Sequence, residues 1–362
     1  NADEGKVEAL AAFGNHDNEI YSKLFKCFTI TESSESIGIV VNKEEVEIQF
    51  SQDEFNGFLA KYKNIKLKSV IIVLLFSTGL SPISSVVMFG VGIPLYYSIP
   101  FGIFIGVLSG FLIVELSSHV ITFHRGYDLY NVGFAGGILA FAYFSIFKLL
   151  DIEYTTNLIY TNDQHLLLLY LYIAICLLFI VVGVILNDKP LKEYFMITKL
   201  SGRAVTDFTR KSNQPLTMFN IGVTGLAALV VLLILNVHMN GPVFGGLMTI
   251  VGFSAFGKHP RNVLPPMIGV LLVTLIFSIP LSVPVVLAII FSTALAPIAG
   301  EHGFIIGVLS GMLHLPIVTS LGQLHGGVLL YSNGFAAAFT AVIFITVIHT
   351  FERSRNNGAT RV

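Results

Sequence analysis

The sequence predicts an all-α integral membrane protein of about ten transmembrane helices with an inverted internal repeat. Three observations support this prediction: the composition, ten apolar segments of near-spanning length, and a sequence repeat between the two halves of the chain. Hydrophobic residues make up 54% of the 362 residues and charged residues 12%, and the mean hydropathy is +0.78. Because about a quarter of the residues in a typical soluble domain are charged, this composition indicates a membrane protein.

The composition and motifs argue against several classes of protein. The formal net charge of −1 gives no indication of nucleic-acid binding. Cys27 and Cys176 allow no disulfide framework and fit no metal-ligand spacing. The sequence has no His-Glu-x-x-His, no Gly-x-Ser-x-Gly, no P-loop and no Gly-x-Gly-x-x-Gly before a helix. We therefore expect no enzymatic activity, no catalytic residues, no cofactor and no bound metal.

One set of side chains has the composition of a metal site, and it is scattered over both halves of the chain. The set is Glu115, His119, His124, His314 and His325. Nothing in the sequence brings three of these residues to one point, so an intramembrane metalloenzyme is a disfavoured alternative.

The first 68 residues form a polar segment. They carry 12 acidic and 8 basic residues, which is 20 of the 43 charged residues in the chain. The alternating pattern of residues 37–50 predicts a short hairpin. The segment has no apolar core of the signal-peptide type, so we expect the first span itself to direct insertion.

Ten apolar segments follow Lys68, each near the length of about 20 residues that a membrane-spanning helix needs. They cover residues 69–86, 99–121, 131–149, 164–187, 216–237, 241–256, 263–280, 283–299, 303–322 and 333–351. The segment 241–256 is short, and a re-entrant segment is the alternative to a span there.

Basic residues set the direction of these spans, because loops rich in Lys and Arg stay in the cytoplasm. Four lysines precede the first span, at 61, 63, 66 and 68, and the segment 188–214 and the tail 352–362 are also basic. The segment 150–163 carries three acidic residues and no basic one. Ten crossings then place both termini in the cytoplasm and every basic loop on the same side. We expect a multi-pass protein of a bacterial inner (plasma) membrane.

The internal repeat joins the two halves of the chain. Gly106-Val-Leu-Ser-Gly110 recurs as Gly307-Val-Leu-Ser-Gly311, and the offset of 201 keeps 15 of the 37 positions from Gly102 to Ile138 identical. Further upstream, residues 76–83 match residues 291–298 at an offset of 215. On the charge pattern the span 99–121 runs inward and its copy 303–322 runs outward. The copies are therefore predicted to be inverted, as in many transporters and channels.

The two copies differ at their front ends. Three spans precede the second copy, whereas a polar segment precedes the first. Either these helices have been lost, or a partner or residues upstream of Asn1 supply them. We divide the chain into a polar N-terminal segment (1–68), a first membrane repeat truncated at its front (69–150), a connecting helix with a cytoplasmic basic loop (151–215), a second membrane repeat (216–351) and a cytoplasmic tail (352–362).

Three stretches resemble a known family. These are the stretch from His325-Gly-Gly to Leu330-Tyr-Ser-Asn-Gly-Phe-Ala-Ala, Asn220-Ile-Gly, and Phe256-Gly-Lys-His. They are similar to an uncharacterised bacterial multi-pass membrane protein family, domain-of-unknown-function family 1576, over roughly residues 69–350. The resemblance implies an internally duplicated membrane protein and no established activity. A weaker similarity, to urea channels, rests on Tyr130-Asn131 before a glycine and on Phe219-Asn220-Ile.

The two segments that join repeated spans are candidates for a substrate-binding site. Each has a His at its start and a Tyr and an Asn just before a Gly-rich helix, where a helix N-terminus carries partial positive charge. If the two segments dip into the membrane, inverted copies would bring these ends together. The candidate ligands are His124, Tyr130, Asn131, His325, Tyr331 and Asn333. The alternative is two interfacial turns, capped by Asn and anchored by Tyr.

Six glycines are spaced four residues apart within the repeat. Small residues at this spacing let membrane helices approach closely, so helix packing is the favoured role and pore lining the alternative. They are Gly102, Gly106 and Gly110 in the first copy and Gly303, Gly307 and Gly311 in the second.

Glu115 is the only acidic residue well inside an apolar segment, and His119 lies one helical turn further on. A charge in that position is costly unless it is paired or protonated, so the pair is a candidate for ion coupling. A neutral structural hydrogen bond is the alternative. The second copy has Pro316 and Ser320 at these positions.

These observations favour a transport protein in the lipid bilayer, either a channel-like facilitator or a secondary transporter. Its substrate is expected to be a small polar or anionic solute, bound at the interface of the two repeats. A homo-oligomer is compatible with this function. The alternative is a membrane scaffold or subunit without transport activity, which docks a partner through its polar N-terminal segment.

Overall fold

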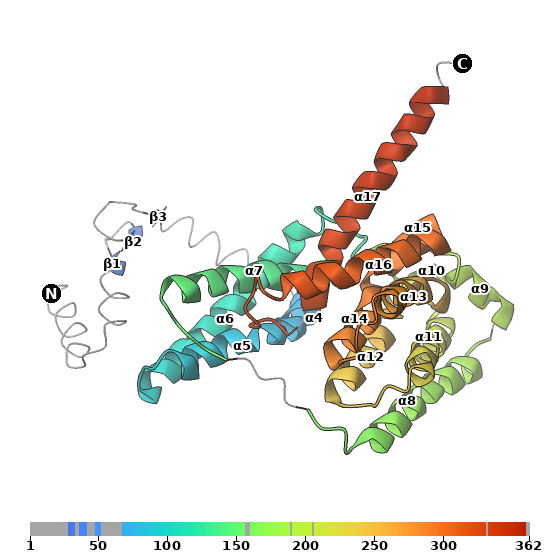
Figure 1. Cartoon of the computed structure of the whole chain (residues 1–362), viewed down its shortest axis with the longest axis horizontal. Helices are drawn as coiled ribbons and strands as arrows, with labels where there is room; N and C mark the ends of the chain where they lie inside the picture. The colour runs from blue at the N-terminus through green and yellow to red at the C-terminus, as the bar shows by residue number, and fades with distance from the viewer. Residues whose placement is uncertain are drawn as a thin grey trace. The chain divides into compact units, whose positions relative to one another are not determined.

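A computed structural model describes residues 28–32, 36–41, 48–51, 67–155, 160–188, 190–204, 206–330 and 332–359. The chain divides into two compact units, Asn1–Ile71 with Ile146–Glu153 and Ile72–Ser145 with Tyr154–Val362. The elements in chain order (Figure 1) are β1 (Phe28–Glu32), β2 (Ser36–Val41), β3 (Ile48–Ser51), α4 (Leu67–Ser77), η1 (Thr78–Leu80), α5 (Ser81–Ser85), η2 (Val86–Gly90), α6 (Leu95–Val120), α7 (Asn131–Leu149), α8 (His165–Ile185), η3 (Leu191–Glu193), α9 (Tyr194–Ile197), α10 (Phe208–Lys211), α11 (Gln214–Ile234), α12 (Gly241–Phe253), α13 (Pro260–Ile276), α14 (Val283–Phe291), η4 (Ser292–Leu295), α15 (Ala296–His302), α16 (Phe304–Leu321) and α17 (Ser332–Ala359).

The three strands of the first unit form an antiparallel sheet in the order β1-β2-β3. Ile37 lies opposite Phe50, and Ile39 opposite Ile48. β2 and β3 are therefore the hairpin expected within residues 37–50, and β1 adds a third strand on the other side of β2.

Eight helical segments of the described chain are long and apolar enough to cross a membrane. The chain is therefore a multi-pass helical membrane protein. The predicted spans 241–256 and 263–280 correspond to α12 and α13, which are shorter, with 13 and 17 residues. At 1.5 Å per residue, α12 covers only about 20 Å of the roughly 30 Å apolar layer.

Polar caps and prolines set the ends of these two short helices. The Asn240 side chain accepts a hydrogen bond from the Val243 N–H and so fixes the start of α12. α13 begins at Pro260, behind a capping box between His259 and Asn262. The predicted segments run past the C-terminal ends of both helices, to residues 256 and 280, whereas α12 ends at Phe253 and α13 at Ile276.

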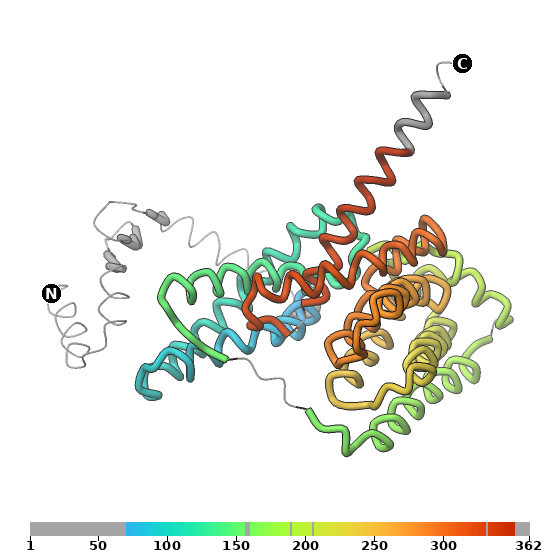
Figure 2. Tube along the Cα trace, viewed as in Figure 1, coloured from blue at the N-terminus to red at the C-terminus, as the bar shows by residue number. Residues whose placement is uncertain are grey.

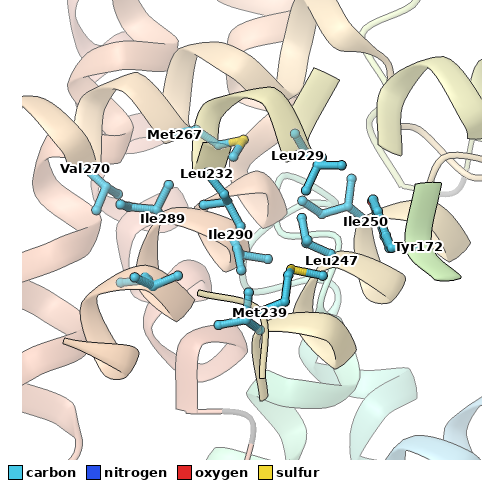
Figure 3. Packing of buried hydrophobic residues seen from close by; sticks show 14 of the residues in the cluster. Tyr172, Leu229, Leu232, Met239, Leu247, Ile250, Met267, Val270, Ile289 and Ile290 are labelled. Carbon is cyan, nitrogen blue, oxygen red and sulfur yellow. The ribbon is translucent and has the colours of Figure 1, made fainter. Parts of the chain in front are cut away.

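The largest core of the second unit lies between α8, α11, α12, α13 and α14 (Figure 3). Tyr172, Leu247, Met267 and Ile289 are fully buried there. α8 lies along α11 (Figure 2), and glycines make this close approach possible. A β-carbon on Gly222 would overlap the backbone of α8.

Four of the six spaced glycines lie where a side chain would collide. β-Carbons on Gly106 and Gly307 would meet Ser84 and Ala299, which are equivalent positions of the two copies. Likewise, a β-carbon on Gly102 would meet Met88, and one on Gly311 would overlap the Pro266 carbonyl of α13.

The other two spaced glycines have no neighbour within 4 Å of such a β-carbon. Gly110 faces open space within α6, whereas Gly303 has a φ of +91° and begins α16. A left-handed conformation of this kind favours glycine.

The sequence repeat is matched by repeated local structure. In each copy a 3-10 turn interrupts an apolar helix: η1 in the first copy and η4 in the second. Pro82 and Pro297 follow these turns, and proline cannot donate the next helical hydrogen bond. The loops after α6 and α16 also share their backbone, since Arg125 and Gly126 have positive φ and so do Gly326 and Gly327.

Candidate functional site

The loop of each copy reaches the interrupted helix of the other copy. The Leu129 N–H donates to the Ala294 carbonyl at 3.0 Å, and the Leu330 N–H donates to the Gly79 carbonyl at 3.0 Å. Leu129 and Leu330 are equivalent in the repeat, as are Gly79 and Ala294. The two bonds therefore join equivalent residues of the two copies in a reciprocal way.

The N-termini of α7 and α17 meet at equivalent residues. A β-carbon on Gly334 would lie 2.9 Å from the Gly133 Cα. The Phe134 and Phe335 rings stack with their centroids 6.0 Å apart. Each contact joins a residue of the first copy to the equivalent residue of the second copy. The first N–H groups of both helices, which have no acceptor within their helix, therefore lie in one region.

A cavity of about 140 Å³ adjoins these two helix starts. Most of its wall is apolar, and four polar side chains contribute to it. The apolar side chains are those of Ile72, Phe76, Leu129, Val132, Phe253 and Phe291, and the polar ones are Tyr130, Asn131, Thr249 and Asn333. The cavity is large enough for a small solute and offers few hydrogen-bonding groups.

A buried lysine lies behind Tyr130. The Lys258 ammonium donates hydrogen bonds to the Tyr130 hydroxyl and, at 2.9 Å, to Thr293 Oγ1. It also lies 4.2 Å from the centroid of the Tyr130 ring and 5.2 Å from that of Phe253. Lys258 has no exposed surface. Two residues of the cavity wall thus contact one buried cation.

Asp128 supplies the opposite charge. Its Oδ1 accepts a hydrogen bond from the Tyr130 N–H at 2.8 Å, whereas its buried Oδ2 has no partner among the described residues. Burial raises the pKa of Asp128 to about 8, although the Tyr130 N–H and the Lys258 charge oppose the rise. Burial likewise holds the pKa of Lys258 well below its usual range. Burial thus disfavours the charged form of both groups.

His124 orients Asn131. Its Nδ1 accepts a hydrogen bond from the Asp128 N–H at 3.2 Å, so the ring proton belongs on Nε2, which bonds Asn131 Oδ1 at 2.9 Å. The Asn131 amide in turn donates to the Ser117 carbonyl at 2.7 Å. Burial lowers the pKa of His124 and favours this neutral form. The chain of bonds fixes the Asn131 side chain at the cavity wall.

The second copy is arranged differently. Asn333 bonds His314 of α16 at 3.2 Å, and no contact between Asn333 and His325 is seen in the described chain. His325 is buried, and neither of its ring nitrogens has a hydrogen-bond partner there. Tyr331 lies outside the described residues.

Of the six predicted ligands, the structure therefore places three at the cavity wall, namely Tyr130, Asn131 and Asn333. His124 lies one hydrogen bond behind them. Among the described residues, no three His, Cys, Asp or Glu side chains gather as a metal site would need.

The pair proposed for ion coupling lies on α6. His119 Nδ1 is 3.9 Å from Glu115 Oε1, and their side chains are 70% and 36% exposed. Neither side chain contributes to the cavity wall.

Three residues of the site were not among the sequence candidates. Lys258 appeared there only within the Phe256-Gly-Lys-His stretch of the family resemblance, and Asp128 and Thr293 were not singled out. One signal was present, because Asp128 is the single acidic residue between the predicted spans 99–121 and 131–149. Its pairing with Lys258, 130 positions away, depends on tertiary structure.

The chain matches the family described as "Protein of unknown function (DUF1576)" over residues 57–149 and 186–350. The protein belongs to this family. The matched DUF1576 ranges include Asp128, Tyr130, Lys258 and Thr293, and they leave out the whole of α8. No curated protein matches the chain, and no solved structure does. The similarity to urea channels thus gains no support.

Proposed function

We propose that this protein transports a small polar or anionic solute across the membrane, through a site where the N-termini of α7 and α17 meet. The observation that carries the proposal is the cavity at these helix starts, beside two interrupted helices that exchange reciprocal hydrogen bonds. Interrupted helices that meet at the interface of two repeats are the usual construction of a transporter site.

Contacts between loops support a two-sided arrangement. One group of loops contains the Arg203 side chain, which donates to the Arg125 carbonyl, and His259, which bonds the Leu200 carbonyl. A second group contains Tyr154, which donates to the Gly326 carbonyl, and Met239, whose N–H donates to His165. The first group coincides with the loops expected inside the cell and the second with those expected outside.

The inverted relation of the repeats does not depend on whether eight or ten helices cross. The first copy begins with the first span, and the second copy begins with the sixth or the eighth. α12 and α13 together add two crossings or none, so the second copy starts on the opposite side in either case. The reciprocal contacts support the same relation.

A passive facilitator and an ion-coupled carrier both fit this architecture. Ion coupling through Glu115 and His119 belongs to the second mechanism. The alternative function is a scaffold that docks a partner through residues 1–68. It predicts that deleting residues 1–60 abolishes the phenotype while substituting Asn131, Asn333, His124 and His325 leaves it intact.

Solute uptake by the purified full chain in liposomes tests the proposal. We expect at least one small solute from a panel of urea, glycerol, formate and nitrate to enter faster than into protein-free vesicles. Thr249→Trp should block this flux, because a large side chain on the cavity wall fills a space of about 140 Å³. Val230→Trp is the matched control, since Val230 is half exposed on α11 and does not line the cavity.

If folded protein passes none of the four solutes, the transport proposal fails and the scaffold is favoured. Equal flux through the Thr249→Trp and Val230→Trp variants would place the pathway elsewhere. Binding gives an independent measurement, because a ligand that binds only the folded state raises the thermal midpoint.

A further inference from the structure

Asp128 and Lys258 are both fully buried and of opposite charge, yet no hydrogen bond and no ion pair within 4 Å joins them among the described residues. Buried charges are normally paired and fully hydrogen-bonded, because an unsatisfied charged atom is costly. Asp128 Oδ2 has neither solvent nor a hydrogen-bond partner among the described residues. Lys258 donates two hydrogen bonds to neutral hydroxyls, those of Tyr130 and Thr293, and none to this carboxylate. The positive charge therefore remains only partly compensated.

This charge lies next to the cavity. Tyr130 and Phe253, whose rings Lys258 contacts, are both part of the cavity wall. On another side of the same space are the first N–H groups of α7 and α17, which carry partial positive charge. No acidic side chain of the described chain lines the cavity. A buried cation and two helix starts thus act on one small space.

We infer that the transported solute is a small monovalent anion, held in this cavity by the positive charge of Lys258, and that Asp128 carries a proton along with it. The inference rests on the proposed transport function and names its substrate class. Three features support it: the volume of the cavity, the position of Lys258 behind the Tyr130 and Phe253 rings of its wall, and the buried oxygen of Asp128 that has no hydrogen-bond partner among the described residues. A dianion would need a second compensating charge that the described cavity wall does not provide.

The proton balance follows from the charges. Above the pKa of Asp128, which burial raises to about 8, a protonated Lys258 and an ionised Asp128 leave the empty site neutral. A bound monovalent anion competes with Asp128 for the Lys258 charge and would leave the site with a net charge of −1. One proton from the water on the entry side then forms an O–H bond at Asp128 Oδ2 and restores neutrality. Anion and proton leave together on the other side, so one cycle moves no net charge.

The raised pKa of Asp128 agrees with this role, because its carboxyl can take up a proton near neutral pH. Other titratable groups near these two residues are His124, Arg125, Tyr127 and Tyr130 on the loop of Asp128, Glu301, which accepts a hydrogen bond from Tyr127, and His259 and Arg261 next to Lys258 in the chain. His124 accepts from the Asp128 N–H, and His259 Nε2 is bonded to the Leu200 carbonyl. η4 and the end of α12 contribute only hydroxyls, apolar groups and an aromatic ring.

The test uses the full chain in liposomes with three probes: nitrate, formate, and urea as a neutral solute of similar size and planar shape. We expect an inward proton gradient to drive accumulation of nitrate or formate by up to about tenfold per pH unit, the limit for one proton per anion. Urea should not accumulate. A valinomycin-imposed potential should leave the anion flux unaffected, because the cycle is electroneutral.

Two substitutions separate the roles of the pair. Asp128→Asn should abolish accumulation driven by the pH gradient and make the remaining anion flux sensitive to membrane potential. Lys258→Met should abolish binding of both anions. Because each single substitution disturbs a buried pair, the double variant Asp128→Asn/Lys258→Met is also measured after its folding has been checked by gel filtration. It should bind neither anion. Asp188→Asn, on the surface, is the control.

The possible outcomes distinguish the inference about the anion and the proton from the proposed transport function on which it rests. If urea passes and neither anion does, the anion inference is wrong and transport stands. If an anion passes without dependence on the pH gradient, or if Asp128→Asn retains that dependence, the proton role is wrong. If none of the three probes crosses with folded protein, both the inference and the proposed function fail.

Discussion

The loops after α6 and α16 have equivalent backbones and different side chains. Both have two residues with positive φ after their His, and both bond the interrupted helix of the other copy. The first loop carries Asp128, whereas the equivalent position of the second carries Leu329. Lys258 lies between α12 and α13, outside the repeated stretches 76–83 with 291–298 and 102–138 with 303–339. The repeated residues therefore explain the geometry of the site, and residues that differ between the copies or lie outside them explain its charges.

The largest effect is expected from making the first loop resemble the second. Asp128→Leu removes the buried carboxylate that opposes the charge of Lys258 and also the acceptor of the Tyr130 N–H, and both losses are costly in a buried site. We expect a strong fall in the thermal midpoint of the detergent-solubilised protein. Adding Lys258→Met should restore much of the lost stability, because replacing both members of a buried pair is often neutral. Equal destabilisation in the single and double variants would contradict a charge pair.

The next largest effect on stability is expected from substituting equivalent glycines of the two copies. Gly311→Ala places a methyl group against the Pro266 carbonyl of α13, which is backbone and cannot move aside. Overpacking of this kind costs about 1–3 kcal/mol. Gly110→Ala, at the equivalent position of α6, meets nothing within 4 Å and should leave the thermal midpoint unchanged or slightly raised. Similar midpoints for the two variants would show that α13 and α16 do not pack as described.

A smaller difference in stability is expected between the alanine variants of Asn131 and of its counterpart Ser332. Asn131→Ala removes two hydrogen bonds and leaves His124 Nε2 and the Ser117 carbonyl without their partner. We expect a loss of about 1 kcal/mol in the free energy of unfolding. Ser332→Ala should change it less, since no side-chain hydrogen bond of Ser332 is seen in the described part of the chain. Chemical denaturation in detergent measures both, and the reverse order would refute the role of Asn131 as an anchored side chain.

The smallest effect on stability is expected at the pair on α6. Glu115→Gln should change the free energy of unfolding by less than about 0.5 kcal/mol, because the side chain is partly exposed and its equivalent in the second copy is Pro316. Transport assays of the same variant compare α6 with the first loop as the place of ion coupling. If it abolishes dependence on the pH gradient while Asp128→Asn does not, coupling belongs to α6 rather than to the first loop.

The sequence predicted much of the fold, because apolar length and repeated residues are local signals. The repeat found through Gly106 and Gly307 is matched by equivalent packing contacts in the structure. The lengths of α12 and α13 were overestimated, since the apolar pattern continues to residues 256 and 280 while the helices end at Phe253 and Ile276.

Less of the candidate site could be predicted. Tyr130 and Asn131 were placed correctly beside a helix start, but the contact of Lys258 with Tyr130 joins residues 128 positions apart. No periodicity or spacing encodes such a contact. The paired His residues also suggested a symmetry that the side chains do not follow, because Asn131 bonds His124 whereas Asn333 bonds His314.

The reciprocal bonds between loops and interrupted helices have a consequence for biogenesis. The Gly79 carbonyl receives its partner only when Leu330 has been made, some 250 residues later during synthesis. Until then an exposed polar group in the first interrupted helix has to be tolerated by the insertion machinery or held near water, since it costs several kcal/mol in lipid. The first half therefore completes its hydrogen bonds only after the second half has been synthesised. A chain severed between α7 and α8 should regain its structure only when both fragments are produced in the same cell.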